Sequence, residues 1–164
     1  MLKDNLKEEL QLDRDFHTNL EHLLMSMVNT NERILECSTQ HLAQFEISPT
    51  QFNALMSLFD YQNKNEGKFL NQKELGEKLL INKASAGALI DRLCKRKWVK
   101  LIPNPKDGRS KLVKLTDQGH QKFLEAFESY YTHLWPLQDG ISNDELITCL
   151  RVFKKLRNNT EKLK

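Results

Sequence analysis

Apolar side chains recur at steps of three or four residues over long parts of this chain, which is the spacing of one buried face of an α-helix. Residues 16–43 form the longest such stretch and predict an amphipathic helix. Three more helices are predicted from their first residues, because Ser48 before Pro49, Asn71 and Asn82 each match the preferences of a helix N-terminus. The core-facing residues expected in the last two are Leu75, Leu79 and Leu80, and then Ala86, Leu89, Ile90, Leu93 and Cys94.

The apolar period shortens to two after Trp98. Alternating apolar positions at 99 and 101, and again at 113 and 115, predict two short strands. Residues 103–109 between them contain two prolines, one glycine and three charged side chains, which is typical of a turn region. The segment therefore predicts a β-hairpin with a long, charged tip.

Two helices are predicted beyond the hairpin. Thr116 is a suitable N-cap for the first, which extends to about Tyr131. Ser142 and Glu145 match a capping box for the second. The apolar residues expected on one side of this last helix are Leu146, Ile147, Leu150, Phe153, Leu156 and Leu163.

Composition narrows the fold class. A chain of 164 residues, 39% apolar and 29% charged, has the size of one domain or of two small ones that share a core. Six glycines and four prolines leave little material for the turns of an all-β fold. The expected fold is therefore mainly α with a small β-hairpin.

The same composition indicates the compartment. No run of about 18 uncharged apolar residues is present, so a membrane-spanning helix is not expected. The first 15 residues also lack the apolar core of a secretory signal. Three widely separated cysteines favour a reducing cytoplasm.

Basic residues are concentrated in about one fifth of the chain. Residues 82–114 contain ten bases and two acids, a net charge of +8, whereas the rest contains fifteen bases and twenty acids, a net charge of −5. A polyanion that contacts only this segment is the simplest physical reason for such a distribution. Charge alone does not distinguish DNA, RNA, an anionic membrane and a solvated face with no partner.

Two helices joined by a short turn and followed by a hairpin are typical of a winged helix-turn-helix. In that arrangement the second helix enters the major groove of DNA, the first crosses the phosphate backbone, and the hairpin, or wing, reaches the neighbouring minor groove. The residues predicted to contact DNA are Lys83, Ala84, Ser85, Ala88, Arg92 and Lys95 in the helix after Asn82, and Lys106, Asp107, Arg109 and Lys111 in the wing.

These residues have different expected roles. Lys83 and Ser85 lie in the first helical turn, where side chains reach base edges, whereas the bases further along the helix are placed for phosphates. Arg109 is the predicted minor-groove probe, because a narrow groove concentrates negative potential. Asp107 would either hold Arg109 in one geometry or cap the turn between them.

The sequence resembles the multiple antibiotic resistance regulator (MarR) family. The most specific part of the resemblance is the wing, in which an Asp-x-Arg motif at residues 107–109 is followed by a strand and by a Leu-Thr-x-x-Gly motif at residues 115–119. The other matching runs are residues 79–85, 89–93, 97–99 and 103–110. A long first helix and a long last helix also belong to that architecture, so the resemblance covers almost the whole chain.

The resemblance implies a bacterial transcriptional regulator that binds a palindromic operator in double-stranded DNA as a homodimer, and that represses or, less often, activates transcription. In this family a small ligand or an oxidant, acting at the junction with the DNA-binding lobes, changes operator affinity. The implied division is an N-terminal dimerisation helix region over residues 1–47, a winged helix-turn-helix DNA-binding domain over residues 48–116, and C-terminal helices that complete the dimerisation domain over residues 117–164.

One departure from the family affects DNA reading. Gly87 and Ala88 stand where the family usually has bulkier or polar residues. Few hydrogen-bonding side chains then remain for direct readout, so contacts with thymine methyl groups and DNA shape carry more of the expected specificity. Gly87 also costs about 1 kcal/mol of helix stability relative to alanine.

The remaining candidate chemistry is sparse. Cys37 is a candidate redox or effector residue, but a buried small apolar side chain is its favoured role, and Cys94 and Cys149 are also expected in the core. Cys37 and His41 are the only Cys/His pair one helical turn apart, so no metal or cofactor is predicted. The chain has no Gly-rich phosphate loop and no nucleophile elbow, so an enzyme is not expected.

A different class of function stays open beside DNA binding. A winged-helix protein-interaction module would use the same basic face to bind an acidic protein. Such a module would shift no DNA duplex at physiological salt and would co-purify with its partner, which separates it from a regulator.

Overall fold

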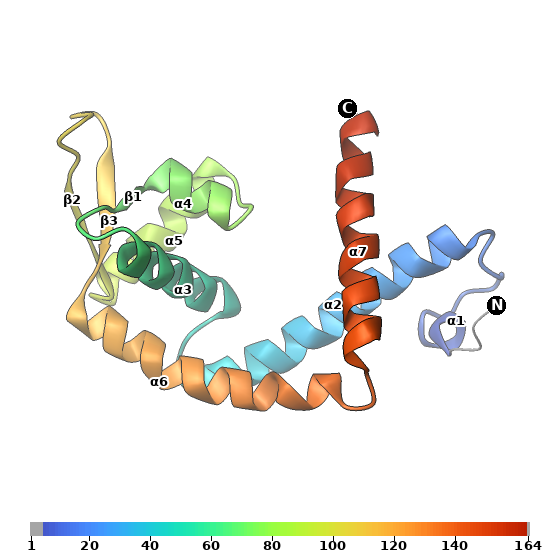
Figure 1. Ribbon diagram of the computed structural model, residues 1–164. Coiled ribbons are helices and arrows are strands. Elements are labelled where there is room, and N and C mark those ends of the chain that lie inside the picture. Colours follow the sequence, from blue (N-terminus) through green and yellow to red (C-terminus); the bar gives the residue numbers. More distant parts are fainter. Residues whose placement is uncertain (1–4, 164) are drawn as a thin grey trace. The chain divides into compact units, whose positions relative to one another are not determined.

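The computed structural model of the chain describes residues 5–163. The chain folds as two compact units, one that ends at Glu128 and one that begins at Ser129. The first unit combines helices with a small sheet (Figure 1). Its elements are α1 (Leu6–Glu9), α2 (Asn19–Ala43), α3 (Pro49–Lys64), β1 (Leu70–Asn71), α4 (Gln72–Lys78), α5 (Lys83–Lys95), β2 (Val99–Pro103), β3 (Lys111–Leu115) and α6 (Asp117–Leu134), which continues into the second unit.

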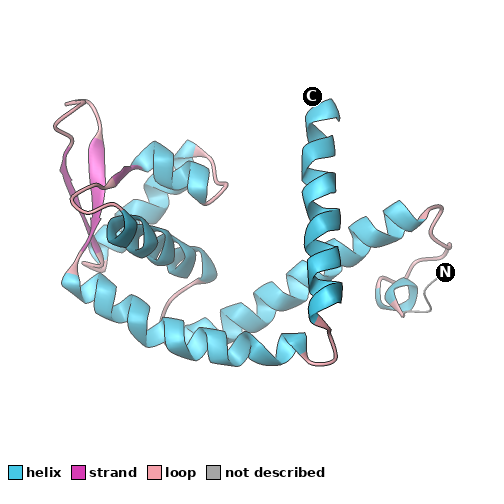
Figure 2. Ribbon diagram, viewed as in Figure 1, coloured by secondary structure: helices cyan, strands magenta, loops and turns pink. Residues whose placement is uncertain are grey.

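The strands form one antiparallel sheet in the order β1-β3-β2. In the hairpin of β2 and β3, Val99 pairs with Leu115 and Leu101 pairs with Val113, as the period of two predicts. Figure 2 shows this hairpin extending past the neighbouring helices as a wing. The prediction of a mainly helical, winged helix-turn-helix fold is confirmed.

Side chains cap the helices where the sequence predicted. Ser48 and Asn71 both form complete capping boxes, the first with Gln51 and the second with Glu74. The Asn82 side chain accepts a hydrogen bond of 2.9 Å from the third backbone N–H of α5. These caps satisfy backbone N–H groups that lack a partner within the helix, and they therefore define where α3, α4 and α5 begin.

The start of α2 and the presence of β1 differ from the prediction. α2 begins at Asn19 rather than near residue 16, because the Thr18 side chain accepts a hydrogen bond from the Glu21 backbone N–H and caps the helix there. Strand β1 was not predicted, because two residues are too few to show an alternating pattern. β1 is identified as a strand only because it pairs with β3, where Leu70 lies opposite Val113.

Leu80 is not a core residue, contrary to the prediction. Its backbone is left-handed, with a φ of 55°. The following N–H, that of Ile81, donates to the Gly76 carbonyl and closes the end of α4 as in a Schellman motif. The Leu80 side chain is consequently 92% exposed in the turn between α4 and α5, whereas Leu75 is fully buried and Leu79 half-buried.

The core of the first unit lies between the end of α2, α3, α4, α5, the sheet and α6. Phe123 of α6 packs against Phe52 and Phe59 of α3, with ring centroids 5.6 Å and 4.9 Å away. The inward face predicted for α5 is buried, apart from the half-buried Cys94. The largest fully buried side chains are Phe52, Phe123, Leu42, Leu55, Leu58, Leu75, Leu89, Ile90, Leu93 and Val113.

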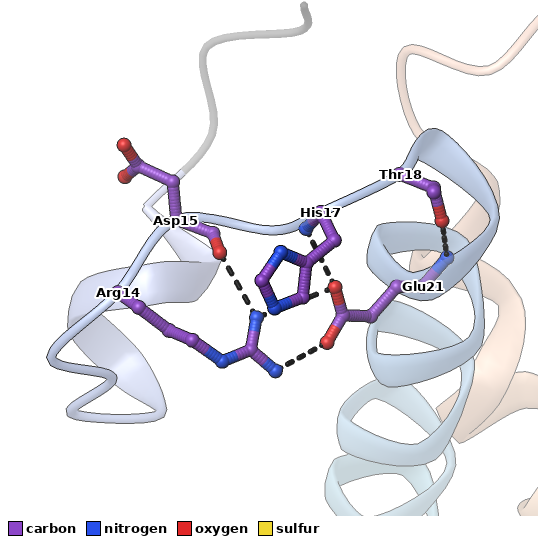
Figure 3. A network of polar contacts seen from close by, with 5 residues as sticks. All are labelled: Arg14, Asp15, His17, Thr18 and Glu21. Atoms are coloured by element: carbon purple, nitrogen blue, oxygen red, sulfur yellow. Dashed lines mark hydrogen bonds and ion pairs between the residues drawn. The ribbon is translucent and has the colours of Figure 1, made fainter.

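The segment before α2 is joined to that helix by charged groups (Figure 3). The Arg14 guanidinium donates to Glu21 over 2.5 Å, and the His17 backbone N–H donates to the same carboxylate over 2.7 Å. These hydrogen bonds lower the pKa of Glu21 to about 2. Further along, the Arg33 guanidinium lies 2.9 Å from the Glu9 carboxylate, which links α1 to the middle of α2.

The second unit has no buried side chain among its described residues, 129–163. Its own elements are η1 (Trp135–Gln138), α7 (Asn143–Thr160), capped by Ser142 as predicted, and η2 (Glu161–Leu163). Leu163 therefore lies in a 3₁₀ turn beyond the helix to which it was assigned. The large apolar side chains that stay exposed here are Tyr131, Trp135, Leu137, Ile141, Leu146, Ile147, Leu150, Val152 and Leu163.

The expected burial of the cysteines is wrong for two of the three. Cys37 and Cys149 are exposed in the single chain, and Cys94 is intermediate. The reason is that α2 and α7 leave much of their apolar faces uncovered, so a cysteine beside such a face has no neighbour to bury it. Partial burial and the nearby Asp91 charge raise the pKa of the Cys94 thiol.

No helix between residues 5 and 163 combines the length and the apolar content that crossing a bilayer requires.

Candidate nucleic-acid interface

Helix α5 separates its buried and exposed faces cleanly. Residues spaced three and four apart, from Ala86 to Leu93, are buried against the core. The residues between them, Ala88 and Arg92 among them, are mostly exposed, so the solvent face of the helix combines small side chains with bases. All ten residues predicted to contact DNA are exposed: Lys83, Ala84, Ser85, Ala88, Arg92 and Lys95 in α5, and Lys106, Asp107, Arg109 and Lys111 in the wing.

The tip of the wing is ordered by its own side chains. The Asn104 amide donates to the Ser110 hydroxyl over 2.8 Å, across the base of the tip. The Asp107 carboxylate accepts a hydrogen bond of 3.0 Å from the Arg109 backbone N–H. Of the two roles considered for Asp107, the geometry supports the cap of the turn. The turn in this way fixes the backbone from which the Arg109 side chain projects.

One cavity joins the start of the helix-turn-helix to the wing. It has a volume of about 690 Å³ and opens between α4, the first turn of α5 and the wing strands. Lys83 from α5 and Arg109 from the wing both line it, so the two predicted DNA probes lie on one surface. The complete lining is Asn71, Gln72, Lys73, Gly76, Glu77, Ile81, Lys83, Leu101, Asp107, Arg109, Ser110 and Lys111.

Asp107 and Lys111 line the same cavity, whereas the other predicted residues lie outside its lining. Ala84, Ser85 and Ala88 are exposed on α5 beside Lys83, and Arg92 lies further along the same helix. Cys37, the candidate redox or effector residue, lies outside the basic segment and is exposed on α2.

Sequence reasoning missed the contribution of α4. Asn71, Gln72 and Lys73 line the cavity from the start of that helix, yet only the capping role of Asn71 was predicted. Lys73 adds a positive charge that lies outside residues 82–114 and was therefore not counted with the basic segment. Polar residues at the start of a helix that crosses the DNA backbone were the available signal.

Two basic side chains of residues 82–114 contact other groups of the protein. The Arg96 guanidinium donates to the Glu46 carbonyl over 2.9 Å and lies 4.8 Å from the centre of the Trp98 ring. The Lys114 ammonium lies 5.3 Å from the centre of the Phe69 ring. Both residues contribute to the positive field, and both side chains also make contacts within the protein.

Close packing of α4 on α5 sets the position of the exposed face. A Cβ added at Gly76 of α4 would lie 3.2 Å from the Ala86 Cβ of α5 and 3.3 Å from the Ile81 carbonyl oxygen. The two helices therefore approach each other through two of the smallest side chains. This contact fixes the angle at which α5 presents Lys83 and Ser85.

The described residues contain no group of three or more His, Cys, Asp or Glu side chains arranged to hold a metal ion. What the surface offers is exposed positive charge on a helix and on a wing. That arrangement suits a duplex with regularly spaced phosphates.

Known proteins share both the sequence pattern and the fold. A family model described as MarR family matches residues 45–110. The multiple antibiotic resistance protein MarR of Salmonella typhimurium is 32% identical over 141 residues, which cover 81% of this chain and 88% of that protein.

Solved structures are similar over most of the chain. A mutant MarR from Escherichia coli complexed with operator DNA has a TM-score of 0.71 at 24% identity, over 94% of this chain and 99% of that one. Bordetella bronchiseptica BpsR, whose DNA binding is regulated by 6-hydroxynicotinic acid, has a TM-score of 0.72 at 22% identity, over 88% and 96%. At these identities the likeness is one of fold.

Proposed function

This chain belongs to the MarR family of winged-helix transcriptional regulators, and we propose that it represses transcription by binding a palindromic operator in double-stranded DNA as a homodimer. Proteins of this family regulate transcription and are not enzymes. The known relatives are bacterial. We further propose that it acts in the cytoplasm and that a small ligand or an oxidant changes its affinity for DNA.

The observation that carries the proposal is the shared surface of Lys83 and Arg109. Lys83 stands at the first position of a capped helix, and Arg109 stands in the turn of the wing. Both line one cavity and both are exposed. A duplex lying across this surface would receive α5 in its major groove and Arg109 in the next minor groove.

The proposed DNA contacts fall into two groups. Lys83, Ala84, Ser85 and Ala88 would face base edges, where Ser85 offers a hydroxyl and the alanines offer contact with thymine methyl groups. The phosphate contacts would come from Arg92, Lys95, Lys106 and Lys111, with Asp107 holding the wing turn.

The homodimer is supported by the apolar surface that the single chain leaves exposed. Val28 of α2 is 64% exposed and Leu150 of α7 is 66% exposed. Exposed apolar patches of this kind are typical of interfaces. We propose that residues 1–47 and 117–164 form the dimerisation region and residues 48–116 the DNA-binding domain. Residues 1–4 and 164 of that division lie outside the described part of the chain.

The effector must bind the DNA-free protein and the DNA-bound protein with different affinities. An effector with equal affinity for both would not change the DNA-binding equilibrium. The regulation of BpsR by 6-hydroxynicotinic acid supports a small-molecule effector for this chain. Cys37 is the candidate site for an oxidant, since its thiol is exposed on α2.

Salt-dependent titration of duplex DNA tests the proposal. If each subunit neutralises about four phosphates, the logarithm of the binding constant falls with the logarithm of salt concentration with a slope of roughly −7 for a dimer. A flat response would contradict it. If no duplex shifts and an acidic protein co-purifies with the chain, the protein-interaction module is supported instead.

A further inference from the structure

Gln72 connects the wing to the first turn of α5. Its amide nitrogen donates a hydrogen bond of 3.2 Å to the backbone carbonyl of Lys83. Gln72 is the first residue of α4, and Lys83 is the first residue of α5. The bond therefore joins the starts of the two helices that form the helix-turn-helix.

The backbone that carries Gln72 is held rigidly. The preceding residue, Asn71, forms a capping box with Glu74, in which each side chain accepts a backbone N–H of the other residue. Asn71 is also paired with Leu112 of the wing strand β3. Asn71 and Gln72 therefore connect the wing strand to the Lys83 carbonyl through strand pairing, one peptide bond and one hydrogen bond.

Gly87 provides the space that Gln72 occupies. A Cβ added at Gly87 would lie 3.0 Å from the Gln72 amide nitrogen. In an α-helix the carbonyl of residue 83 points toward the N–H of residue 87, so a side chain at 87 would crowd a second donor to that carbonyl. Gly87 lowers the intrinsic stability of α5 as a helix. The same glycine leaves the Lys83 carbonyl accessible to the Gln72 amide.

We propose that Gln72 is a positioning residue for DNA recognition, and that Gly87 is the gap that admits it. The pair sets the orientation of the first turn of α5 relative to the wing. It therefore determines how well the protein distinguishes its preferred sequence from other sequences, while the phosphate-binding bases determine the overall strength. This inference rests on the proposed function.

The test measures selectivity as the ratio of two affinities. One duplex is enriched from a random-sequence library by the unchanged protein, and the other is a shuffled duplex of equal length and composition. Gln72→Ala and Gly87→Ala are each expected to lower the ratio about two- to tenfold, the effect of one net hydrogen bond. The slope of affinity against salt should not change, because neither substitution removes a charge.

Further variants separate positioning from general stability. The double variant Gln72→Ala with Gly87→Ala should lose no more selectivity than either single variant, because both break the same bond. Gly87→Ala should keep or raise Tm, since alanine favours the helix. Gln72→Met, which keeps the length of the side chain without a charge and has no amide donor, should behave as Gln72→Ala. Gln121→Ala, an exposed glutamine of α6, is the matched control and should change nothing.

A measurement without DNA separates positioning from direct contact. In the DNA-free protein, Gln72→Ala should speed hydrogen exchange at the backbone amides of Ser85 and Ala86. These two amides donate to the side chain and to the carbonyl of Asn82, respectively, at the start of α5. Unchanged exchange with lowered selectivity would overturn the inference, because Gln72 would then contact DNA itself. Unchanged selectivity, or additive losses in the double variant, would overturn it as well. If the unchanged protein binds no duplex at low salt, the proposed function fails first and the inference fails with it.

Discussion

Gly119 lies directly against the backbone of Trp98. A Cβ added at Gly119 would stand 2.0 Å from the Trp98 carbonyl oxygen and 2.7 Å from its carbonyl carbon. The same carbonyl accepts hydrogen bonds from the backbone N–H and the hydroxyl of Thr116, each 3.0 Å long. The start of α6 is thereby fixed to the residue that precedes β2, and no side chain larger than hydrogen fits at position 119.

Gly119→Ala is predicted to destabilise the protein by about 1–3 kcal/mol or more, because the added methyl group collides with backbone that has no room to move. The melting temperature should fall by several degrees. Gly108→Ala is the matched control, since a Cβ there meets nothing within 4 Å. Equal melting temperatures for the two variants would show that the contact with Trp98 is not tight.

Arg109→Ala is predicted to weaken binding to all duplexes and to reduce the magnitude of the salt slope by about two for a dimer, one released counterion per subunit. Ser85→Ala should instead weaken binding mainly at preferred sites, because a hydroxyl facing base edges carries no charge. Fluorescence anisotropy over a range of salt concentrations measures both. A salt slope that Arg109→Ala leaves unchanged would place this charge away from the duplex.

Arg96→Ala is predicted to lower Tm while leaving the salt slope almost unchanged. The Arg96 guanidinium donates to the Glu46 carbonyl and lies over the Trp98 ring, so a contact with a phosphate would have to compete with these interactions. Thermal melts and the same anisotropy titration provide the two readouts. A reduction of the slope as large as that of Arg109→Ala would contradict the assignment.

Acid is predicted to release the segment before α2. The Glu21 carboxyl has its pKa lowered to about 2, mainly by the Arg14 hydrogen bond and next by the His17 backbone N–H. Because the folded pKa lies below the unfolded value, this stabilisation is present above pH 4.5 and is lost as the pH falls toward 2. Glu21→Gln should remove that part of the pH dependence.

Titration of the Glu21 side-chain carbon by NMR checks this prediction. Arg14→Ala should move the titration midpoint upward toward the ordinary value of a glutamate. Arg92→Ala, which removes a similar charge from α5 of the same compact unit, should not move it. A midpoint near 4.5 in the unchanged protein would show that the contact with Arg14 does not persist in solution.

Leu150→Glu is predicted to yield a monomer. The Leu150 side chain is 66% exposed in the single chain, and a carboxylate placed in an apolar interface would be desolvated without a partner. Sedimentation equilibrium measures the change, with Asn158→Asp as a charge-matched control on the same helix. The DNA affinity should fall with dimer formation, because two half-sites would no longer be bound together. A Leu150→Glu dimer as stable as the unchanged one would exclude this face from the interface.

Local chemistry explains which parts of the fold were predictable. The caps at Ser48, Asn71, Asn82 and Ser142 each act within three residues of the chain, so the sequence reveals them directly. The wing strands are predictable for the same reason, because apolar and polar positions alternate along each strand. β1 did not, because its two residues become a strand only by pairing with β3, about forty residues later.

The candidate site was predictable in its residues but not in its geometry. The sequence identified Lys83 and Arg109 from their elements and from the concentration of positive charge. That both border one cavity with Gln72 and Lys73 depends on how α4 packs beneath the wing. Leu80 illustrates the same limit, since its apolar character indicated burial and a left-handed backbone turned it to solvent.

The sequence by itself determined the helices, the hairpin and the basic segment, because side-chain periods, caps and charge runs act between residues a few positions apart. The tertiary structure decided which bases stay free, since Arg96 is held by Glu46, fifty residues earlier in the chain. It also decided that Gln72 meets the Lys83 carbonyl across Gly87. Such contacts depend on the distance and angle between packed helices, and a local pattern contains neither.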